Sequence, residues 1–156
     1  MIADAAFELV PAIDMDVVRA LFREYQQELG VDLCFQGFDA ELAGLPGDYA
    51  PPRGRLILAT GAGRVAGCVA LRPLGDGACE MKRLYVRPSG RGHGLGRVLA
   101  QTLIAAARDL GYQRMLLDTT PSMTSAQDLY ASLGFTRTTP YRYNPIDGAT
   151  FWQLNL

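Results

Sequence analysis

A chain of 156 residues has room for one domain, and we expect a single domain over residues 1–156. Its 49% hydrophobic and 20% charged residues are typical of a soluble globular protein and exclude an intrinsically disordered chain. The net charge of −1 excludes an extreme polycation or polyanion. Three cysteines at positions 34, 68 and 79, with no CxxC pair, argue against a disulfide framework and against a zinc site.

The sequence shows no membrane or export signal. No apolar run approaches the ~20 residues that span a bilayer, and the first residues carry neither the basic nor the apolar part of a signal peptide. Basic and aromatic residues do not interleave as they do in nucleic-acid-binding surfaces. We therefore expect a cytoplasmic protein with no membrane partner and no nucleic-acid partner. A homodimer is left open.

The near-neutral total conceals two halves of opposite charge. Residues 1–50 carry ten acids and two bases, a charge of −8, whereas residues 51–156 carry six acids and thirteen bases, a charge of +7. Five of these bases fall within sixteen residues that contain no acid: Lys82, Arg83, Arg87, Arg91 and Arg97. We interpret the two halves as surfaces for different partners, an anion for the basic run and a cation for the acidic half. An ordinary solvated surface is the alternative.

The first half predicts a strand and two helices. Residues 7–10 are predicted to form a short strand that ends at Pro11. Asp14 caps a helix that ends at Gly30, because apolar residues recur at helical spacing between them. A short second helix is expected near residues 38–45, before the Pro46-Gly47 and Pro51-Pro52 breakers.

From residue 55 the pattern becomes that of strands. Short glycine-bearing links join residues 55–60, 64–74 and 78–86, which indicates an antiparallel meander. A helix from Leu95 to Leu110 and a strand at 114–119 follow, and a strand, a crossover helix and a strand imply parallel pairing. A helix at 123–133 and strands at 135–142 and 149–155 complete an α+β fold with a mixed, mostly antiparallel sheet.

A glycine-rich turn separates the strand at 78–86 from the next helix. Its glycines alternate at Gly90, Gly92, Gly94 and Gly96. Glycine allows a ligand to approach backbone N–H groups closely, and a helix N-terminus adds unpaired donors and a partial positive charge. The turn therefore predicts a phosphate-binding site with Arg91 and Arg97 as charge partners. Neither the P-loop pattern GxxxxGK[ST] nor the dinucleotide pattern GxGxxG fits this sequence.

The turn does fit another motif. Arg91-x-x-Gly94-x-Gly96 matches the [RQ]xxGx[GA] motif of the GCN5-related N-acetyltransferase (GNAT) family. The strand over residues 80–86 resembles the fourth strand of that family, and residues 126–135 are similar to its AxxLYxxxGF segment. The resemblance covers about residues 78–136. It implies a GNAT-like fold with a parallel pair at splayed fourth and fifth strands and helices on both faces of the sheet.

The resemblance implies acetyl-CoA as co-substrate, bound where those two strands separate. The backbone of Leu84 and Val86 would pair with the pantetheine arm, and amides from Gly92 to Arg97 would hold the pyrophosphate. The full predicted set is Leu84, Tyr85, Val86, Arg91, Gly92, His93, Gly94, Leu95, Gly96 and Arg97. No metal is expected, since His93 is the only histidine.

Direct acetyl transfer to an amine, as the resemblance implies, needs a base, a polarised carbonyl and an acid. Glu80, on the strand beside the cleft, is the candidate base, directly or through water; an ion-paired strand carboxylate is the alternative. Tyr130 occupies the position of the acid that protonates the CoA sulfur in the family, and a packed core tyrosine is the alternative. A backbone N–H near Val86 would polarise the carbonyl.

One position departs from the family pattern. Met123 stands where the family often carries Asn, so an amide contact to pantetheine is missing. Thr124 or Ser125 could replace it, but both are expected to cap the following helix. Asp118 ends the fifth strand, where it could face the substrate or cap the turn before Pro121.

We therefore expect an acetyl-CoA-dependent N-acetyltransferase that acts on a primary amine of a small molecule or of an amino terminus. The alternative is a non-catalytic acyl-CoA-binding sensor or regulatory module, which only Met123 favours. A third interpretation is a phosphate-anchored enzyme that uses Glu80 and Asp118 as a carboxylate pair. The acidic first half suggests a cationic acceptor.

Overall fold

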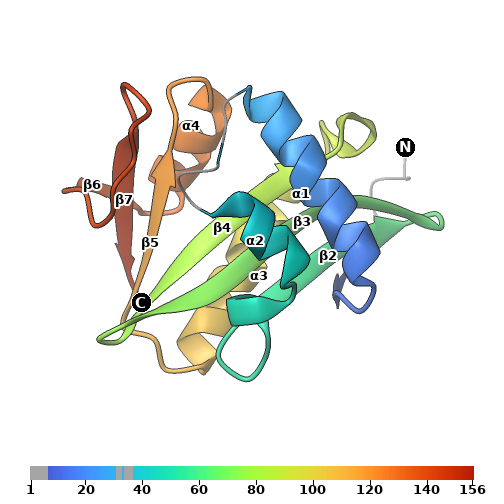
Figure 1. The fold of residues 1–156 in the computed structure, drawn as a ribbon, viewed down its shortest axis with the longest axis horizontal. Helices are drawn as coiled ribbons and strands as arrows, with labels where there is room; N and C mark the ends of the chain where they lie inside the picture. Colours follow the sequence, from blue (N-terminus) through green and yellow to red (C-terminus); the bar gives the residue numbers. More distant parts are fainter. Residues whose placement is uncertain (1–6, 31–32, 34–36) are drawn as a thin grey trace.

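The computed structural model describes residues 7–30, 33 and 37–156. In chain order the elements are β1 (Glu8–Pro11), α1 (Met15–Leu29), α2 (Phe38–Ala43), the 3-10 turn η3 (Gly47–Tyr49), β2 (Arg55–Gly61), β3 (Arg64–Gly75), β4 (Ala78–Val86), the 3-10 turn η4 (Pro88–Gly90), α3 (Leu95–Asp109), β5 (Arg114–Thr119), α4 (Thr124–Ser132), β6 (Thr136–Thr138) and β7 (Thr150–Asn155). The strands form one sheet in the order β1-β2-β3-β4-β5-β7-β6 (Figure 1).

The sheet confirms the predicted mixture of pairings. Neighbours from β1 to β4 are antiparallel, β4 and β5 are parallel, and β7 pairs antiparallel with both β5 and β6. The predicted strand over residues 135–142 is wrong in length, since β6 covers only Thr136–Thr138. The chain leaves the sheet after Thr138, and Tyr141 and Arg142 turn inward to bond Glu80.

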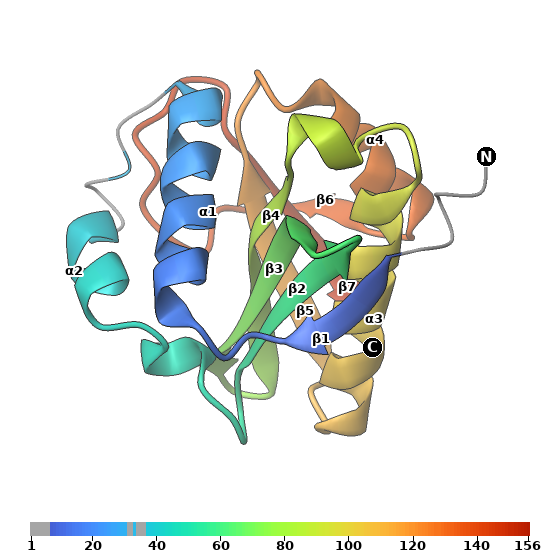
Figure 2. The ribbon, with the colours of Figure 1, turned by 90° about the vertical axis from the view of Figure 1, so that its right-hand side faces the viewer.

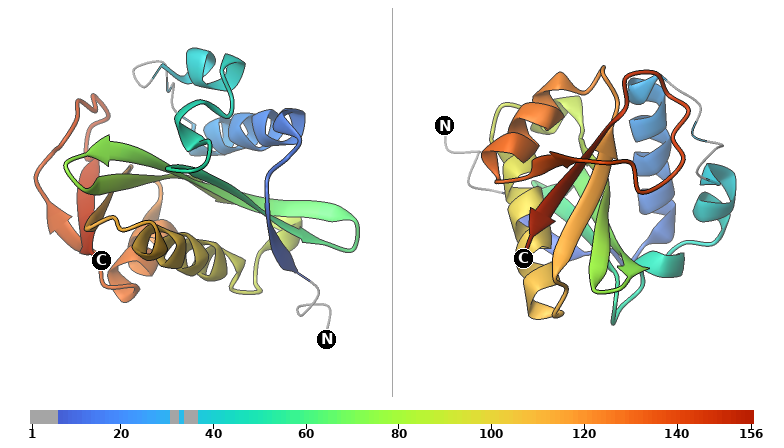
Figure 3. Two further views of the ribbon diagram at one scale, coloured as in Figure 1. Left: turned by 90° about the horizontal axis from the view of Figure 1, so that it is seen from below. Right: turned by 90° about the vertical axis from the view of Figure 1, so that its left-hand side faces the viewer.

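Helices cover both faces of the sheet, as expected. α1 and α2 lie on one face, and α3 and α4 lie on the other (Figures 2 and 3). Asp14 caps α1 by accepting from the Asp16 amide, and Gly30 ends it with a φ of 74°, so both predicted ends of this helix are confirmed. The strand residues alternate between the two faces, and two buried apolar clusters result, one beneath α1 and α2 and one beneath α3.

The end of β4 is distorted in a way that shapes the site. β4 and β5 pair only from Ala78 to Glu80, and then diverge. Just beyond, the pairing with β3 shifts between Cys68 and Ala70, which leaves one extra residue in β4. The bulge contains Arg83 with a φ of 60°, a left-handed conformation that costs an ordinary residue about 1–2 kcal/mol. A bulge of this kind bends a strand and re-aims its side chains.

Candidate active site

A cleft of about 440 Å³ opens beside the end of β4, beyond the residues at which β4 pairs with β5. Five of the ten predicted cofactor residues line it: Leu84, Tyr85, Val86, Arg91 and Gly96. The start of α4 and the end of α1 form the remaining walls. The walls combine apolar side chains with the hydroxyls of Ser122, Thr124 and Ser125. A long flexible ligand with apolar and polar parts fits such a cleft.

The glycine turn presents a helix N-terminus at the mouth of this cleft. Gly94 is the N-cap of α3 with a φ of 71°, and no side chain caps the helix. The first turn carries no acid, so its backbone N–H groups and the helix dipole favour an anion. Leu95 is buried in the core, and any contact it makes with a ligand is through its backbone.

The remaining predicted residues of the turn lie beside the cleft rather than in its wall. The His93 ring packs against Phe7, with the ring centroids 5.8 Å apart. The Arg97 guanidinium donates to the Ser132 hydroxyl at 2.6 Å, which ties the first turn of α3 to the end of α4. The backbone at Gly92 has a φ of 87°.

Arg91 connects three elements around the cleft. Its Nε donates to the Val86 carbonyl at 2.9 Å, and one terminal nitrogen contacts both Glu28 oxygens at 2.5 and 2.6 Å. Glu28 lies near the end of α1 and also lines the cleft. Arg91 and Glu28 are both about half exposed, so an anionic ligand can reach the guanidinium.

The two charged halves of the sequence pair with each other. Three acids from the first half bond three bases of the basic run, in the pairs Glu41–Arg83, Glu24–Arg87 and Glu28–Arg91. Glu24 and Glu28 belong to α1, which lies over the sheet beside β4 (Figure 1). The fold therefore brings the two halves together at these six residues, which the sequence could not show, and the interpretation that they serve two different partners stays a prediction.

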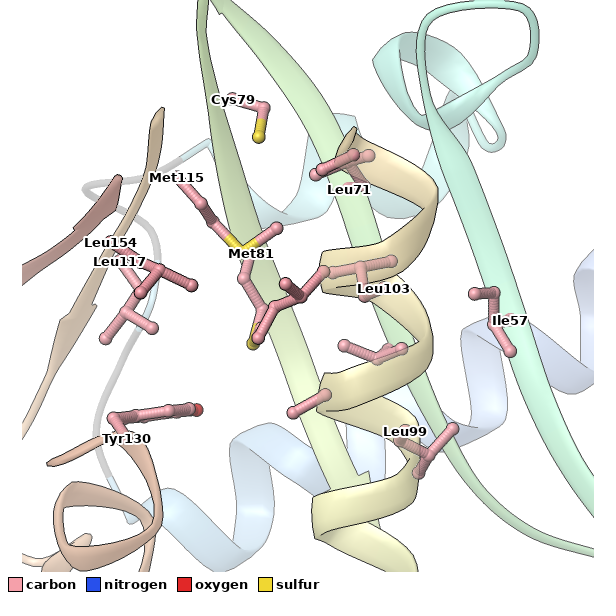
Figure 4. Close-up of a cluster of buried hydrophobic side chains, with 14 of the residues drawn as sticks. Ile57, Leu71, Cys79, Met81, Leu99, Leu103, Met115, Leu117, Tyr130 and Leu154 are labelled. Carbon is pink, nitrogen blue, oxygen red and sulfur yellow. The ribbon is translucent and has the colours of Figure 1, made fainter. Parts of the chain in front are cut away.

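A second, smaller cavity of about 30 Å³ adjoins the cleft and shares four lining residues with it: Tyr25, Leu29, Leu84 and Met123. Its other walls include Lys82 from β4, Asp118 from β5 and Tyr130 from α4. Tyr130 is 4% exposed and extends from α4 toward β4 (Figure 4). Burial raises the pKa of Tyr130, with smaller contributions from Tyr25 and Asp118, so its phenol stays protonated.

Glu80 is fully buried and lines neither cavity. Oε1 accepts from Arg72 at 2.7 Å and from Arg142 at 2.9 Å, and Oε2 accepts from the Tyr141 hydroxyl at 2.5 Å. Burial favours a higher pKa for Glu80, but the charges of Lys82, Arg142 and Arg72 and the Tyr141 hydroxyl outweigh it and lower the pKa. Its carboxylate is therefore held ionised, and its role as base stays a prediction.

Two polar groups of the small cavity were not assigned from sequence. Lys82 is 7% exposed, and burial together with neighbouring Arg83 lowers its pKa to about 7. Asn144 donates to Oδ2 of Asp118 at 3.1 Å. The run of five bases within residues 82–97 includes Lys82 and could have drawn attention to it. Nothing in the sequence links Asn144 to Asp118.

The start of α4 differs from the expected capping. Met123 is the N-cap and makes no capping hydrogen bond with its side chain, and Thr124 donates to the Pro121 carbonyl at 3.5 Å instead. The predicted caps at Thr124 and Ser125 are therefore wrong. Both hydroxyls line the cleft, beside the position where the family often carries Asn.

Comparison with known proteins decides the family. The model of the acetyltransferase (GNAT) family matches residues 16–135. An uncharacterised N-acetyltransferase of Schizosaccharomyces pombe is 45% identical over 145 residues, which cover 92% of this chain and 89% of the relative. The chain belongs to the GNAT family. Members of this family are acyltransferases, and this chain is one of them.

Solved acetyltransferase structures agree with this fold. An acetyltransferase from Streptococcus agalactiae superposes with a TM-score of 0.80 at 20% identity, covering 97% of this chain and 99% of that one. A putative acetyltransferase from Salmonella typhimurium, solved with acetyl-CoA, has a TM-score of 0.67 at 25% identity and covers 96% of this chain and 94% of its own. The splayed strands and glycine turn described above are thus part of a GNAT fold.

Two further features of the described residues bear on function. None of the helices there is both long enough and apolar enough to cross a bilayer. Within the same residues, no three side chains of the His, Cys, Asp or Glu type come together as a metal site would require.

Proposed function

We propose that this GNAT protein transfers an acetyl group from acetyl-CoA to a primary amine of a small molecule or of an amino terminus. The observation that carries the proposal is the junction of the two cavities. The larger one is lined by predicted cofactor residues, and the smaller one, directly beyond it, is lined by Tyr130 and Asp118.

The residues of the cleft suit acetyl-CoA. The uncapped N-terminus of α3 and Arg91 would hold the pyrophosphate, and the backbone of Leu84 and Val86 would hold the pantetheine arm. The Ser125 and Thr124 hydroxyls lie where they would replace the missing amide at Met123. The bound thioester would supply the acetyl group at the junction with the small cavity.

In the proposed transfer, the acceptor nitrogen forms a bond to the acetyl carbon and the carbon–sulfur bond breaks. Tyr130 gives its phenolic proton to the leaving sulfur, because burial keeps the phenol protonated. Glu80 receives the proton lost by the amine. Neither Glu80 nor the Tyr141 hydroxyl bonded to it lines a cavity, so the proton would reach Glu80 through water.

The test is release of CoA thiol with a panel of primary amines. Turnover is expected for the native chain and is expected to be lost in Arg91→Glu and Gly94→Asp, which place negative charge at the anion site. Full turnover in these variants would overturn the proposal.

Binding of acetyl-CoA without turnover on any amine would instead support the sensor interpretation. Tyr130→Phe should bind acetyl-CoA normally and turn over slowly.

A further inference from the structure

Arg91 of the glycine turn is paired with an acid of the chain itself. Its Nη2 contacts Oε1 and Oε2 of Glu28 at 2.5 and 2.6 Å, and its Nε donates to the Val86 carbonyl at 2.9 Å. Glu28 and Arg91 both line the cleft, and both side chains are about half exposed. The guanidinium proposed to hold the pyrophosphate of acetyl-CoA therefore has a carboxylate of the protein as a competing partner.

The position of Glu28 is unfavourable for an acid unless a base lies beside it. Glu28 belongs to the last turn of α1, which carries no base, and the C-terminal end of a helix has a partial negative charge. Arg91, 63 residues further along the chain, supplies the compensating charge. If another anion bound Arg91, Glu28 would lie beside two negative groups, the helix end and that anion.

Glu24, one turn earlier on α1, is bound in a different way. It accepts from Nε and Nη2 of Arg87 at 2.9 and 2.8 Å, and the Tyr85 hydroxyl donates to it at 3.4 Å. Neither Glu24 nor Arg87 lines the cleft. This pair therefore holds α1 against the segment that follows β4, whereas the pair of Glu28 and Arg91 forms part of the cleft wall.

A phosphate ligand can displace Glu28 at small cost. An ion pair between half-exposed side chains contributes little to stability, because water solvates both partners when they separate. A guanidinium binds phosphate oxygens strongly, and the uncapped N-terminus of α3 favours the same anion. A carboxylate and a pyrophosphate beside one guanidinium repel each other. Binding of the pyrophosphate is therefore opposed by Glu28.

We infer that Glu28 competes with the pyrophosphate of acetyl-CoA for Arg91 and so lowers the affinity of the protein for its cofactor. Pyrophosphate binding breaks the contact between Glu28 and Arg91, and the free energy of that contact is lost from the free energy of binding. The inference rests on the acetyl-CoA site of the proposed function, but not on the transfer of the acetyl group. The opposite role, in which Glu28 positions Arg91 for the ligand, predicts an effect of the opposite sign.

The experiment measures by calorimetry the binding of CoA and of dephospho-CoA, which keeps the pyrophosphate but lacks the 3′-phosphate. Glu28→Gln keeps the size of the side chain and removes its charge, and it should bind both ligands about three- to tenfold more tightly than the native chain. Glu24→Gln is the matched control, since it removes the same charge one turn earlier on α1. Its affinity for both ligands should stay within about twofold of the native value, because charges farther from the ligand are screened.

A double substitution shows whether Glu28 acts through Arg91. Arg91→Gln alone should bind CoA more weakly than the native chain. Adding Glu28→Gln to Arg91→Gln should then give a smaller gain in affinity than Glu28→Gln gives in the native chain. The same gain in both backgrounds would mean that Glu28 only repels the ligand directly, and this result would overturn the inference.

The other outcomes are equally distinct. Equal or weaker binding of CoA by Glu28→Gln would overturn the inference, and weaker binding would make Glu28 a positioning residue for Arg91. A gain with CoA that is absent with dephospho-CoA would overturn it too, because Glu28 would then oppose the 3′-phosphate. If the native chain binds neither ligand, the cofactor site of the proposed function is itself contradicted.

Discussion

The larger cleft and the small cavity share a wall but are built on different principles. The cleft depends on backbone: one strand end, a glycine turn and an uncapped helix N-terminus that follow one another over residues 84–97. The small cavity depends on side chains from β4, β5, α4 and the loop before β7. A backbone site tolerates changes of side chain, whereas a buried charge cluster fails when one charge is removed. The contrast can be tested by substitution.

The largest expected effect is the loss of the Glu80 charge. Glu80→Gln leaves Arg72 and Arg142 facing a neutral amide in a buried position, and breaking a buried pair costs about 3–5 kcal/mol. The free energy of unfolding from urea titration should fall by that amount. Glu8→Gln, at an exposed position of β1, is the control and should change it by less than about 0.5 kcal/mol. Equal stability of the two variants would show that Glu80 does not hold the cluster together.

Loss of the Tyr130 hydroxyl should come next. Tyr130→Phe removes the proposed acid but keeps the aromatic ring. The value of kcat should fall about 100-fold, which is the lower end of the rate effects of general acid catalysis. The ring still packs against Phe135, with centroids 5.7 Å apart in the native chain, so the melting temperature should change little. If kcat is unchanged at saturating acceptor, Tyr130 is a packing residue only.

Two glycines of the turn should respond differently to alanine. Gly94 has a φ of 71°, and Gly94→Ala forces a left-handed conformation that costs about 1–2 kcal/mol. At Gly96 an added Cβ meets only ordinary contacts, at 3.9 Å from Leu129 and Val86, so Gly96→Ala should bind acetyl-CoA almost normally. Calorimetry measures the affinity of both variants for acetyl-CoA. If the two substitutions weaken binding equally, the space for a side chain, and not the backbone conformation, limits the turn.

Lys82 should give the stability of the protein a distinctive pH dependence. Its folded pKa of about 7 lies below the ordinary lysine value of 10.5, so between these values the unfolded chain binds more protons than the folded one. The free energy of unfolding should therefore gain a rising contribution as pH increases above about 7. Urea titrations at pH 6.5, 7.5 and 8.5 should show a steeper rise for the native chain than for Lys82→Met. Parallel slopes would argue that Lys82 titrates normally.

The smallest effect is expected at the partly exposed Glu24–Arg87 pair beside the cleft. Both side chains are about one-third exposed, and such pairs contribute less than about 1 kcal/mol. Glu24→Gln should lower the free energy of unfolding by no more than this, and the loss should shrink in high salt. A loss as large as that of Glu80→Gln would remove the distinction between partly exposed and buried charge pairs.

Much of the fold was predictable because it follows from local patterns. The alternation of residues and the glycine links located β2, β3 and β4 to within a residue or two of their observed ends. Gly30, in a left-handed conformation, ends α1 as expected. β6 was too long in the prediction because Tyr141 and Arg142 satisfy a distant buried carboxylate instead of extending the strand. The bulge at Arg83 carries no local signal, since it is held by Glu41 from α2.

The sequence by itself determined the family, most of the sheet and the position of the glycine-rich turn, because these depend on residues that are neighbours in the chain. Only the tertiary structure decided which charges of the acidic and the basic half of the chain pair with each other. It paired three acids of the first half with Arg83, Arg87 and Arg91 and placed Lys82 and Asp118 in one cavity. Charge pairing depends on distances of a few ångström and on exclusion of water, and both are set by how distant segments pack together.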